Sequence, residues 1–224
     1  FPGTAGTCTG TIANATNCDI EVEFAPTVTG LQADTIEIQY NDGAAVVSST
    51  RDVQGTGASP ALITITETDP YDFGTLAQGA TTTHIFTLNN GGGVDATLMA
   101  GTGLVAPFVF TGGAYPGTAG TCGATLVPTA SCDIEVEFSP TVPGVFNDTI
   151  DINYFDGAAN VTSSRDVTGT GVPPALLTIT ESDPYDFGLI ANGGTTTHLF
   201  TITNAGGVSA TAVVETGLAA PFDY

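Results

Sequence analysis

The sequence contains no lysine, and its only cationic side chains are Arg51 and Arg165, against 23 aspartates and glutamates. Its formal net charge is therefore −21. A surface with this charge repels nucleic-acid phosphates and anionic membranes, and it attracts cations or basic partners. Nucleic-acid binding is thus excluded as a function. The glycine-rich stretch GTAGTC, which occurs twice, also lacks the lysine of a phosphate-binding loop, so it is predicted to form turns.

Long apolar runs are missing as well. No run approaches the roughly 20 residues that span a bilayer, and the first residues do not combine a basic segment with an apolar one, as a signal peptide would. We therefore expect no membrane insertion from these residues. Hydrophobic residues nevertheless make up 42% of the 224 residues, which is too many for a disordered chain. This length accommodates roughly two ordinary domains.

The sequence repeats itself at an offset of 114 residues. Without any gap, 69 of the 110 positions that overlap at this offset are identical. The segment CDIEVEF occurs in both copies, preceded in each by a further cysteine. Repeats this similar are typical of tandem arrays of one domain.

Two matching stretches, GTGASPAL at 55–62 and GTGVPPAL at 169–176, predict the domain boundaries, because glycine and proline interrupt strand ladders. They define the C-terminal half of one repeat at 1–57, a complete repeat at 58–172 and the N-terminal half of the next at 173–224. Isolated halves would expose apolar surface at a cost of about 25 cal/mol per Å². Either the C-terminal half of one chain completes the N-terminal half of the next, or the segment belongs to a longer polypeptide.

Alternation of apolar and polar residues predicts the strands, and no segment of helical length shows a 3.6-residue period. Seven strands are expected in the complete repeat, at 61–67, 81–90, 95–101, 107–112, 131–138, 147–155 and 160–169. The stretches between them, such as DPYDFG and SPTVPG, are rich in turn residues. Seven short strands per 114-residue repeat indicate an all-β fold of tandem immunoglobulin-like antiparallel β-sandwiches.

The strands at 131–138 and 147–155 are expected to have one apolar and one polar face. The predicted inward residues are Cys132, Ile134, Val136, Phe138, Ile150, Ile152 and Tyr154, and the predicted outward ones are Asp133, Glu135, Glu137, Asp151 and Asn153. Carboxylates directly opposed on neighbouring strands would destabilise the sheet by about a few tenths of a kcal/mol or more for each pair. A bound cation would relieve this repulsion.

Calcium binding is therefore a hypothesis, either for this acidic face or for two acidic loops. One loop contains Asp69 and Asp72, and the equivalent loop contains Asp183 and Asp186. The EF-hand pattern of calcium ligands is absent. We expect no other cofactor.

The four cysteines form two pairs with the same spacing, Cys8 with Cys18 and Cys122 with Cys132. Each pair is predicted to form a disulfide that closes a short loop and that requires an oxidising compartment. A zinc site would need four clustered ligands, and one cysteine pair per repeat does not supply them.

The sequence offers no set of catalytic residues, and we expect that the protein is not an enzyme. Each repeat has one histidine, His84 or His198, on a predicted strand, and the Gly-x-Ser-x-Gly motif of a nucleophile elbow is absent. Arg51 and Arg165 are expected to pair with carboxylates of their own domain or of the next one, or to form plain surface ion pairs. Asn14, Asn147 and Asn160 begin N-x-Thr sequons and are glycosylation candidates, although such sequons also arise by chance in a threonine-rich chain.

The pattern CGATLVPTASCDIEVEFSPTVPGVFNDTIDI, followed by VTGTG and FGLIANGGTTTHLFTITNAGG, resembles the Hydin-like repeats of bacterial surface proteins, often called choice-of-anchor D repeats. The shared features are a cysteine pair, a Phe-x-Pro turn, a Gly-x-Gly end and an Asn-x-Gly-Gly turn. The resemblance covers the whole sequence. It implies secreted, multi-domain proteins of the cell surface in which such modules act as spacers or adhesive stalks, and it implies no catalytic residue.

Two functions are compatible with these features. The first is a structural segment of an extracellular cell-surface filament or stalk, whose partners are copies of itself. The second is an adhesin whose repeats bind a glycan or a host protein through loop aromatics, for which Tyr115, Tyr154 and Phe155 are the candidates. Near-identity of the repeats favours the filament, because spacers need only a reproducible junction between neighbours.

Overall fold

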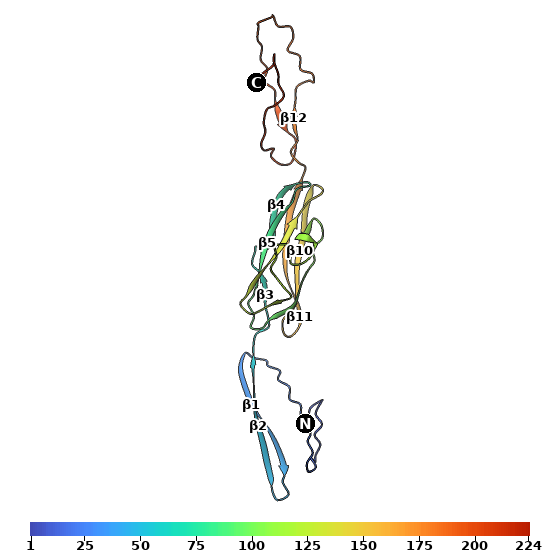
Figure 1. Cartoon of the computed structure of the whole chain (residues 1–224), viewed down its shortest axis with the longest axis vertical. Coiled ribbons are helices and arrows are strands. Elements are labelled where there is room, and N and C mark those ends of the chain that lie inside the picture. Colours follow the sequence, from blue (N-terminus) through green and yellow to red (C-terminus); the bar gives the residue numbers. More distant parts are fainter. The chain divides into compact units, whose positions relative to one another are not determined.

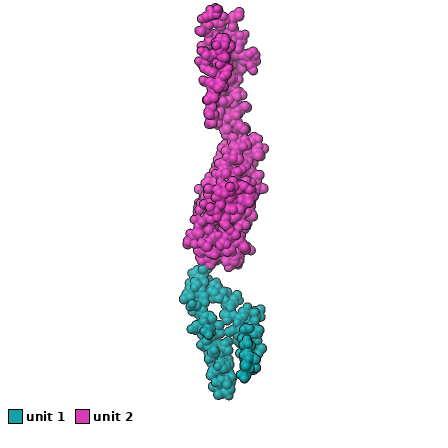
Figure 2. Space-filling model, in the orientation of Figure 1, with its two compact units in different colours: residues 1–60 teal, residues 61–224 magenta.

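The computed structural model describes all residues from 1 to 224, and the chain divides into two compact units, residues 1–60 and residues 61–224 (Figure 2). The first boundary falls inside the predicted linker at 55–62. None of the helical segments has the length and apolarity needed to cross a membrane.

Residues 61–172 form a sandwich of two β-sheets (Figure 1). One sheet has the order β3 (Ile63–Ile65), β5 (Thr82–Asn90), β9 (Ser131–Phe138) and β7 (Phe108–Phe110). The other has the order β4 (Tyr71–Ala77), β11 (Asn160–Val172), β10 (Gly144–Phe155), β6 (Ala96–Thr102) and β8 (Thr125–Leu126). A short 3-10 turn, η1 (Thr111–Gly113), follows β7. The all-β, immunoglobulin-like fold is thus confirmed.

All seven predicted strands are present, but the prediction missed two others, β4 and β8. The stretch DPYDFG was predicted to be a turn, whereas β4 begins within it at Tyr71 and pairs with β11 in parallel. Its Tyr71 and Phe73 pack against the core, so the two apolar residues of the stretch outweigh its turn residues. The parallel pair also means that the sheet is not purely antiparallel.

The core lies between the two sheets and follows the predicted alternation. In β9, Ile134, Val136 and Phe138 are fully buried while the intervening acidic residues are half-buried. In β10, Ile150 and Ile152 are fully buried and Tyr154 nearly so. The faces predicted for both strands are therefore confirmed.

Phe138 lies at the centre of an aromatic cluster in this core. Its ring centroid lies 4.8 Å from that of Phe108 and 5.9 Å from that of Phe73. Gly169 of β11 lies against the same ring, and a Cβ added there would lie 2.8 Å from it. The first glycine of the Gly-x-Gly end is thus required because the chain passes directly over Phe138, and the second, Gly171, is required because a Cβ there would lie 2.6 Å from the Val142 carbonyl oxygen.

The unit of residues 1–60 contains one long hairpin, β1 (Gly30–Asn41) paired with β2 (Val46–Gly57). Its register joins Gly30 to Gly57, as β10 and β11 join Gly144 to Gly171. Residues 17–24, which correspond to β9, form no strand here.

Residues 173–224 contain one short antiparallel pair, β12 (Leu177–Ile179) with β13 (Ile202–Asn204). No residue of this segment is buried. The core of the chain therefore lies in residues 61–172.

Candidate functional site

The carboxylates on the strands accept hydrogen bonds from hydroxyl groups on neighbouring strands. The pairs, with donor to acceptor distances from 2.6 to 3.0 Å, are Thr87 to Asp133, Ser164 to Asp151, Thr149 to Asp166, Ser48 to Glu37 and Thr35 to Asp52. The bond from Ser48 lowers the pKa of the Glu37 carboxyl, because it favours the charged form. Because the chain has no lysine to pair with these carboxylates, serine and threonine hydroxyls stabilise their negative charge by donating hydrogen bonds.

The predicted repulsion between opposed carboxylates does not arise on β9, because the register places neutral residues opposite its acidic ones. Asp133, Glu135 and Glu137 lie opposite Thr87, Ile85 and Thr83 of β5, and Glu137 also lies opposite Val109 of β7. The argument for a cation on this face, which assumed facing carboxylates, is therefore wrong.

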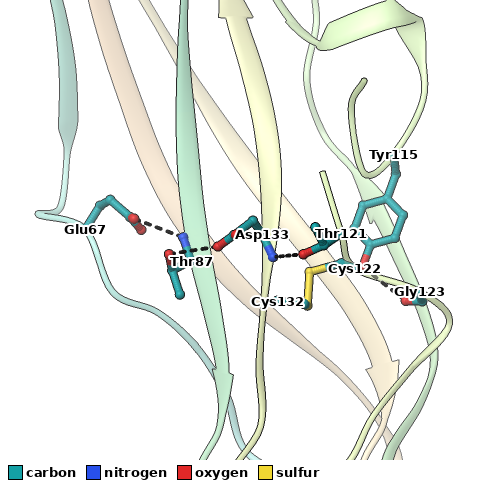
Figure 3. The surroundings of a disulfide bond; sticks show 8 residues. All are labelled: Glu67, Thr87, Tyr115, Thr121, Cys122, Gly123, Cys132 and Asp133. Atoms are coloured by element: carbon teal, nitrogen blue, oxygen red, sulfur yellow. Dashed lines mark hydrogen bonds between the residues drawn. A yellow bond between two sulfur atoms is a disulfide. The ribbon is translucent and has the colours of Figure 1, made fainter. Parts of the chain in front are cut away.

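A disulfide fixes one end of this acidic face (Figure 3). Cys122 and Cys132 are bonded, with their Cα atoms 4.9 Å apart. Beside them, the Asp133 backbone N–H donates to the Thr121 hydroxyl at 2.9 Å. Cys8 and Cys18 form the equivalent bond in the first unit, and no cysteine is free. Both disulfides that the cysteine spacing predicted are present.

Removing the Cys122–Cys132 disulfide should destabilise the sandwich. With both cysteines replaced by serine, we expect the free energy of unfolding to fall by about 2 to 3 kcal/mol, because the unfolded chain gains the freedom of an opened loop. Urea unfolding of the whole chain, followed by circular dichroism, measures the loss. The same double change at Cys8 and Cys18 is the matched control and should leave the sandwich transition unchanged; an equal effect of both pairs would contradict the prediction.

The calcium candidates do not lie in a cluster of ligands. Asp69 forms an ion pair with Arg165 and accepts the backbone N–H of Asp166, while Asp72 accepts the N–H of Gly74. In the last segment, Asp186 accepts the N–H of Gly188, and Asp183 lies in the corresponding loop. Three metal-binding side chains come together nowhere in residues 1–224.

Arg165 connects two distant parts of the sandwich. Its guanidinium donates to the backbone carbonyl of Ile65 and lies 3.5 Å from the Asp69 carboxylate. Both partners belong to the first half of the domain, and Arg165 belongs to the second. Of the predicted alternatives for Arg165, pairing with a carboxylate of its own domain is the one that the structure contains. Arg51 is exposed and has no carboxylate within ion-pair distance.

His84 stacks on Tyr71, with ring centroids 4.0 Å apart, and its Nδ1 lies 2.9 Å from the Tyr71 hydroxyl. Its Nε2 is buried and has no hydrogen-bond partner. Burial lowers the pKa of His84, although the nearby Glu67 opposes the shift. The Tyr71 hydroxyl is the one side-chain group hydrogen-bonded to its ring, and His84 also packs edge-on against Phe86, so the contacts of His84 are those of a packed side chain.

The pKa of His84 predicts a pH dependence. Because the folded pKa lies below the unfolded value of about 6.5, the unfolded chain binds more protons, and stability falls as the pH decreases through this value. We expect His84→Gln, which can still accept the Tyr71 hydroxyl, to lose less stability than the wild type between pH 7.5 and 5.5. Thermal unfolding at both pH values measures this difference. His198→Gln is the control: it lies in the segment without a buried core, so this variant should lose as much stability of the sandwich as the wild type. If the wild type lost no more stability than His84→Gln, the prediction would be refuted.

The loop aromatics proposed for an adhesin are placed differently. Tyr154 is a core residue whose hydroxyl accepts the Ile63 N–H, so its assignment to a binding loop is wrong. Tyr115 is half-buried against Phe110, and burial raises the pKa of Tyr115 to about 12. Phe155 is half-buried at the end of β10.

The glycosylation candidates lie on the surface, since Asn14, Asn147 and Asn160 are all exposed. Two surface depressions are lined by residues such as Pro70, Asp148 and Thr149 in one case and Leu104, Phe110 and Tyr115 in the other. In the first, the Thr149 hydroxyl donates to the Asp166 carboxylate at 2.8 Å, which is one of the cross-strand pairs described above.

Asn90 is the one buried polar side chain that the sequence did not single out. Its Nδ2 donates to the carbonyls of Val94 and Leu126, and its Oδ1 accepts the N–H groups of Leu62 and Gly92. It thereby joins three segments of the domain. The Asn-x-Gly-Gly turn was the available signal, because a polar residue at a strand end before glycines is typical of side-chain capping of a turn.

Comparison with known proteins gives a family match for the sandwich. Residues 63–165 match the model of the HYDIN/CFA65/VesB-like, Ig-like domain. No curated protein matches the sequence.

Among solved structures, the VesB protease of Vibrio cholerae is similar with a TM-score of 0.39 and 16% identity, over 50% of this chain and 32% of that one. The seventh PapD-like domain of human CEP192 has a TM-score of 0.36 and 17% identity, over 52% of this chain and 88% of that one. A protein of unknown function from Porphyromonas gingivalis W83 has a TM-score of 0.40 and 14% identity, over 68% and 70%. The chain thus spans about a third of the length of VesB.

Proposed function

We propose that the chain is a structural segment of an extracellular filament or stalk built in tandem from domains like the one at residues 63–165, which matches the HYDIN/CFA65/VesB-like, Ig-like domain. The observation that carries this proposal is the gapless repeat, in which 69 of 110 positions are identical at an offset of 114 residues. The offset applies to the strands, the linkers and the disulfide pairs alike. A constant spacing is what a chain of identical spacers requires.

Three further features support the proposal. The two disulfides suit an oxidising compartment. The carboxylates are held by hydroxyl groups, so the high negative charge is compatible with stable sheets. Finally, the linker between β11 and β12 contains Pro173 and Pro174, and proline-rich linkers stiffen the connection between domains.

We propose a non-catalytic role. The adhesin alternative has lost part of its support, since Tyr154 lies in the core. The remaining loop aromatics, Tyr115 and Phe155, are half-buried, so each exposes only part of its ring for stacking against a glycan.

Electron microscopy of intact cells of the source organism, labelled with antibodies raised against this chain, tests the proposal. We expect gold particles along extended surface filaments, because every repeat carries the same epitopes. Label confined to the interior of the cells, or to isolated surface particles without any elongated structure, would contradict it. Labelling only at the tips of filaments would instead favour the adhesin.

A further inference from the structure

The chain enters and leaves the sandwich at opposite ends of its last strand, β11. At the entry, the Ala61 N–H donates to the carbonyl of Asp156, in the turn that precedes β11. At the exit, Val172 ends β11, and its carbonyl accepts the Gln78 N–H. A strand of 13 residues is roughly 40 Å long. The two points through which the sandwich joins the rest of the chain are therefore separated by about the length of this strand.

The strand β4 pairs in parallel with β11 over five residue pairs, from Tyr71 with Val167 to Ala77 with Val172. Tension along the chain reaches β4 from the entry, through β3, and reaches β11 from the exit. Because the strands are parallel, tension pulls them in opposite directions along their common axis. The ladder hydrogen bonds run across from strand to strand, so tension stretches all of them at once. A hairpin pulled apart at its open end would instead lose its hydrogen bonds one at a time.

Side-chain contacts extend this ladder towards the entry. Arg165 of β11 donates to the Ile65 carbonyl at the end of β3 and lies 3.5 Å from the Asp69 carboxylate. Asp69 also accepts the Asp166 N–H at 3.1 Å. The segment that crosses from β3 to β4 is thus tied to β11 directly ahead of the first ladder pair.

The exposure of Asp69 distinguishes its role under tension from its role at rest. Its side chain is 54% exposed, whereas that of Arg165 is 16% exposed. An ion pair with one partner this exposed adds little to the equilibrium stability. The two contacts of Asp69 nevertheless join the crossing segment to β11, so both must break before β4 can slide past β11.

We propose that the sandwich bears tension along the chain and that a mechanical clamp, formed by the β4–β11 ladder with Asp69 and Arg165, controls its unfolding under force. A spacer in an unstressed stalk needs only a constant length, so resistance to tension goes beyond the proposed function. The clamp depends on the filament only for its biological use, because it is built entirely within residues 61–172.

The Cys122–Cys132 disulfide lies outside this clamp. Cys132 belongs to β9, in the other sheet, and Cys122 is ten residues before it. The bond joins neither β4 nor β11, so tension reaches the closed loop only after the clamp opens. The disulfide then shortens the length of chain that unfolding releases. We therefore expect it to set the extension of the unfolded sandwich and to leave the unfolding force unchanged.

Single-molecule force spectroscopy tests the clamp through the direction of pulling. The whole chain held at its two ends loads the β4–β11 ladder along its axis. A Gln78→Cys chain, whose new thiol is free because the native cysteines are all bonded, is held at residue 78 and at its C-terminal end. Gln78 is bonded to Val172, so this pull peels the two strands apart from one end. Peeling should need at most about half the force, since the hydrogen bonds break in turn.

Replacing Arg165 tests the side-chain contacts. Arg165→Met keeps the aliphatic part of the side chain and removes the charged bonds, so the force for pulling at the two ends should fall by roughly a third. The force for peeling from residue 78 should stay the same, because that opening starts at the other end of the ladder. A general loss of stability would lower both forces. Arg51→Met, which changes the exposed equivalent outside the sandwich, is the matched control and should leave both forces unchanged.

Serine in place of both Cys122 and Cys132 completes the test. The extension step of the sandwich should lengthen by about 30 Å, because ten more residues at roughly 3.5 Å each are released from a span of 4.9 Å. The force at which the step occurs should not change. A fall in force as large as that of Arg165→Met would overturn the inference, as would an equal effect of Arg165→Met in both directions or no effect in either. Equal wild-type forces in the two directions, together with antibody-labelled filaments on cells, would refute the clamp and leave the filament proposal standing.

Discussion

Phe138→Ala should lower the free energy of unfolding of the sandwich by about 3 to 5 kcal/mol. The side chain is fully buried, and its ring contacts those of Phe108, Phe73 and Phe146. Gly169 also lies on it. Neighbours drawn from both sheets cannot close the cavity without moving a strand, so the upper part of this range is expected.

The chain contains a matched control for this change. Phe24 is the equivalent of Phe138, and half of its surface is exposed. Phe24→Ala should shift the sandwich transition by less than about 0.5 kcal/mol, as surface substitutions do. Urea unfolding followed by circular dichroism measures both variants. Similar losses for Phe24→Ala and Phe138→Ala would show that the two positions are not distinguished by burial.

The difference between these two phenylalanines also marks what the sequence could predict. Both sit in the same CDIEVEF segment, and the period-2 pattern predicts the inward face correctly for Ile134, Val136 and Phe138. The pattern does not reveal whether a strand has neighbours to pair with. That depends on segments far away in the chain: β9 pairs with β5 and β7, whereas the equivalent residues 17–24 form no strand in this structure.

The contacts of Arg165 and of the strand carboxylates were less predictable than the fold, because they depend on which residues of neighbouring strands lie opposite one another. The partner of Arg165 lies 100 residues away along the chain, and no local pattern identifies it. The hydroxyl-to-carboxylate bonds, such as Thr87 to Asp133, arise from cross-strand pairing that the sequence does not specify. Local signals succeeded where the interaction itself is local, as for the disulfides that close ten-residue separations.

The parallel strand β4 was missed for a related reason. Its first residues, Tyr71 and Asp72, belong to a stretch rich in turn residues, and its pairing partner is the distant β11. Only the alternation of Tyr71 and Phe73 indicated a strand. In a chain that carries many glycines and prolines, a short strand with such residues is therefore easily mistaken for a loop.

Asn90→Leu should destabilise the sandwich by about 3 to 5 kcal/mol, although leucine has the same branching and the same number of side-chain heavy atoms. The change removes four hydrogen bonds, and it leaves the N–H groups of Leu62 and Gly92 and the carbonyls of Val94 and Leu126 without their partner. An unpaired buried group costs about 1 to 3 kcal/mol. The N–H groups are partly accessible to water, so we expect less than the sum of four full penalties.

Asn204 provides the control, because it forms the equivalent bonds to Leu176, Gly206 and Val208 in the exposed segment. Water replaces these bonds, so Asn204→Leu should change the stability of the sandwich by less than about 0.5 kcal/mol. Urea unfolding in dilute solution compares the two variants. Equal losses would contradict the role of burial at Asn90.

Asn90→Asp separates hydrogen bonding from volume. The new carboxylate would point an acceptor at the carbonyls of Val94 and Leu126, where Asn90 now places a donor. The folded pKa of this carboxyl would rise above the unfolded value of about 3.9, because only the protonated form can donate. The variant should therefore be strongly destabilised at pH 7 and regain part of its stability, relative to the wild type, as the pH falls through the raised folded pKa towards the unfolded value. A loss for Asn90→Asp that does not change with pH would mean that packing, and not the two donated bonds, makes this residue necessary.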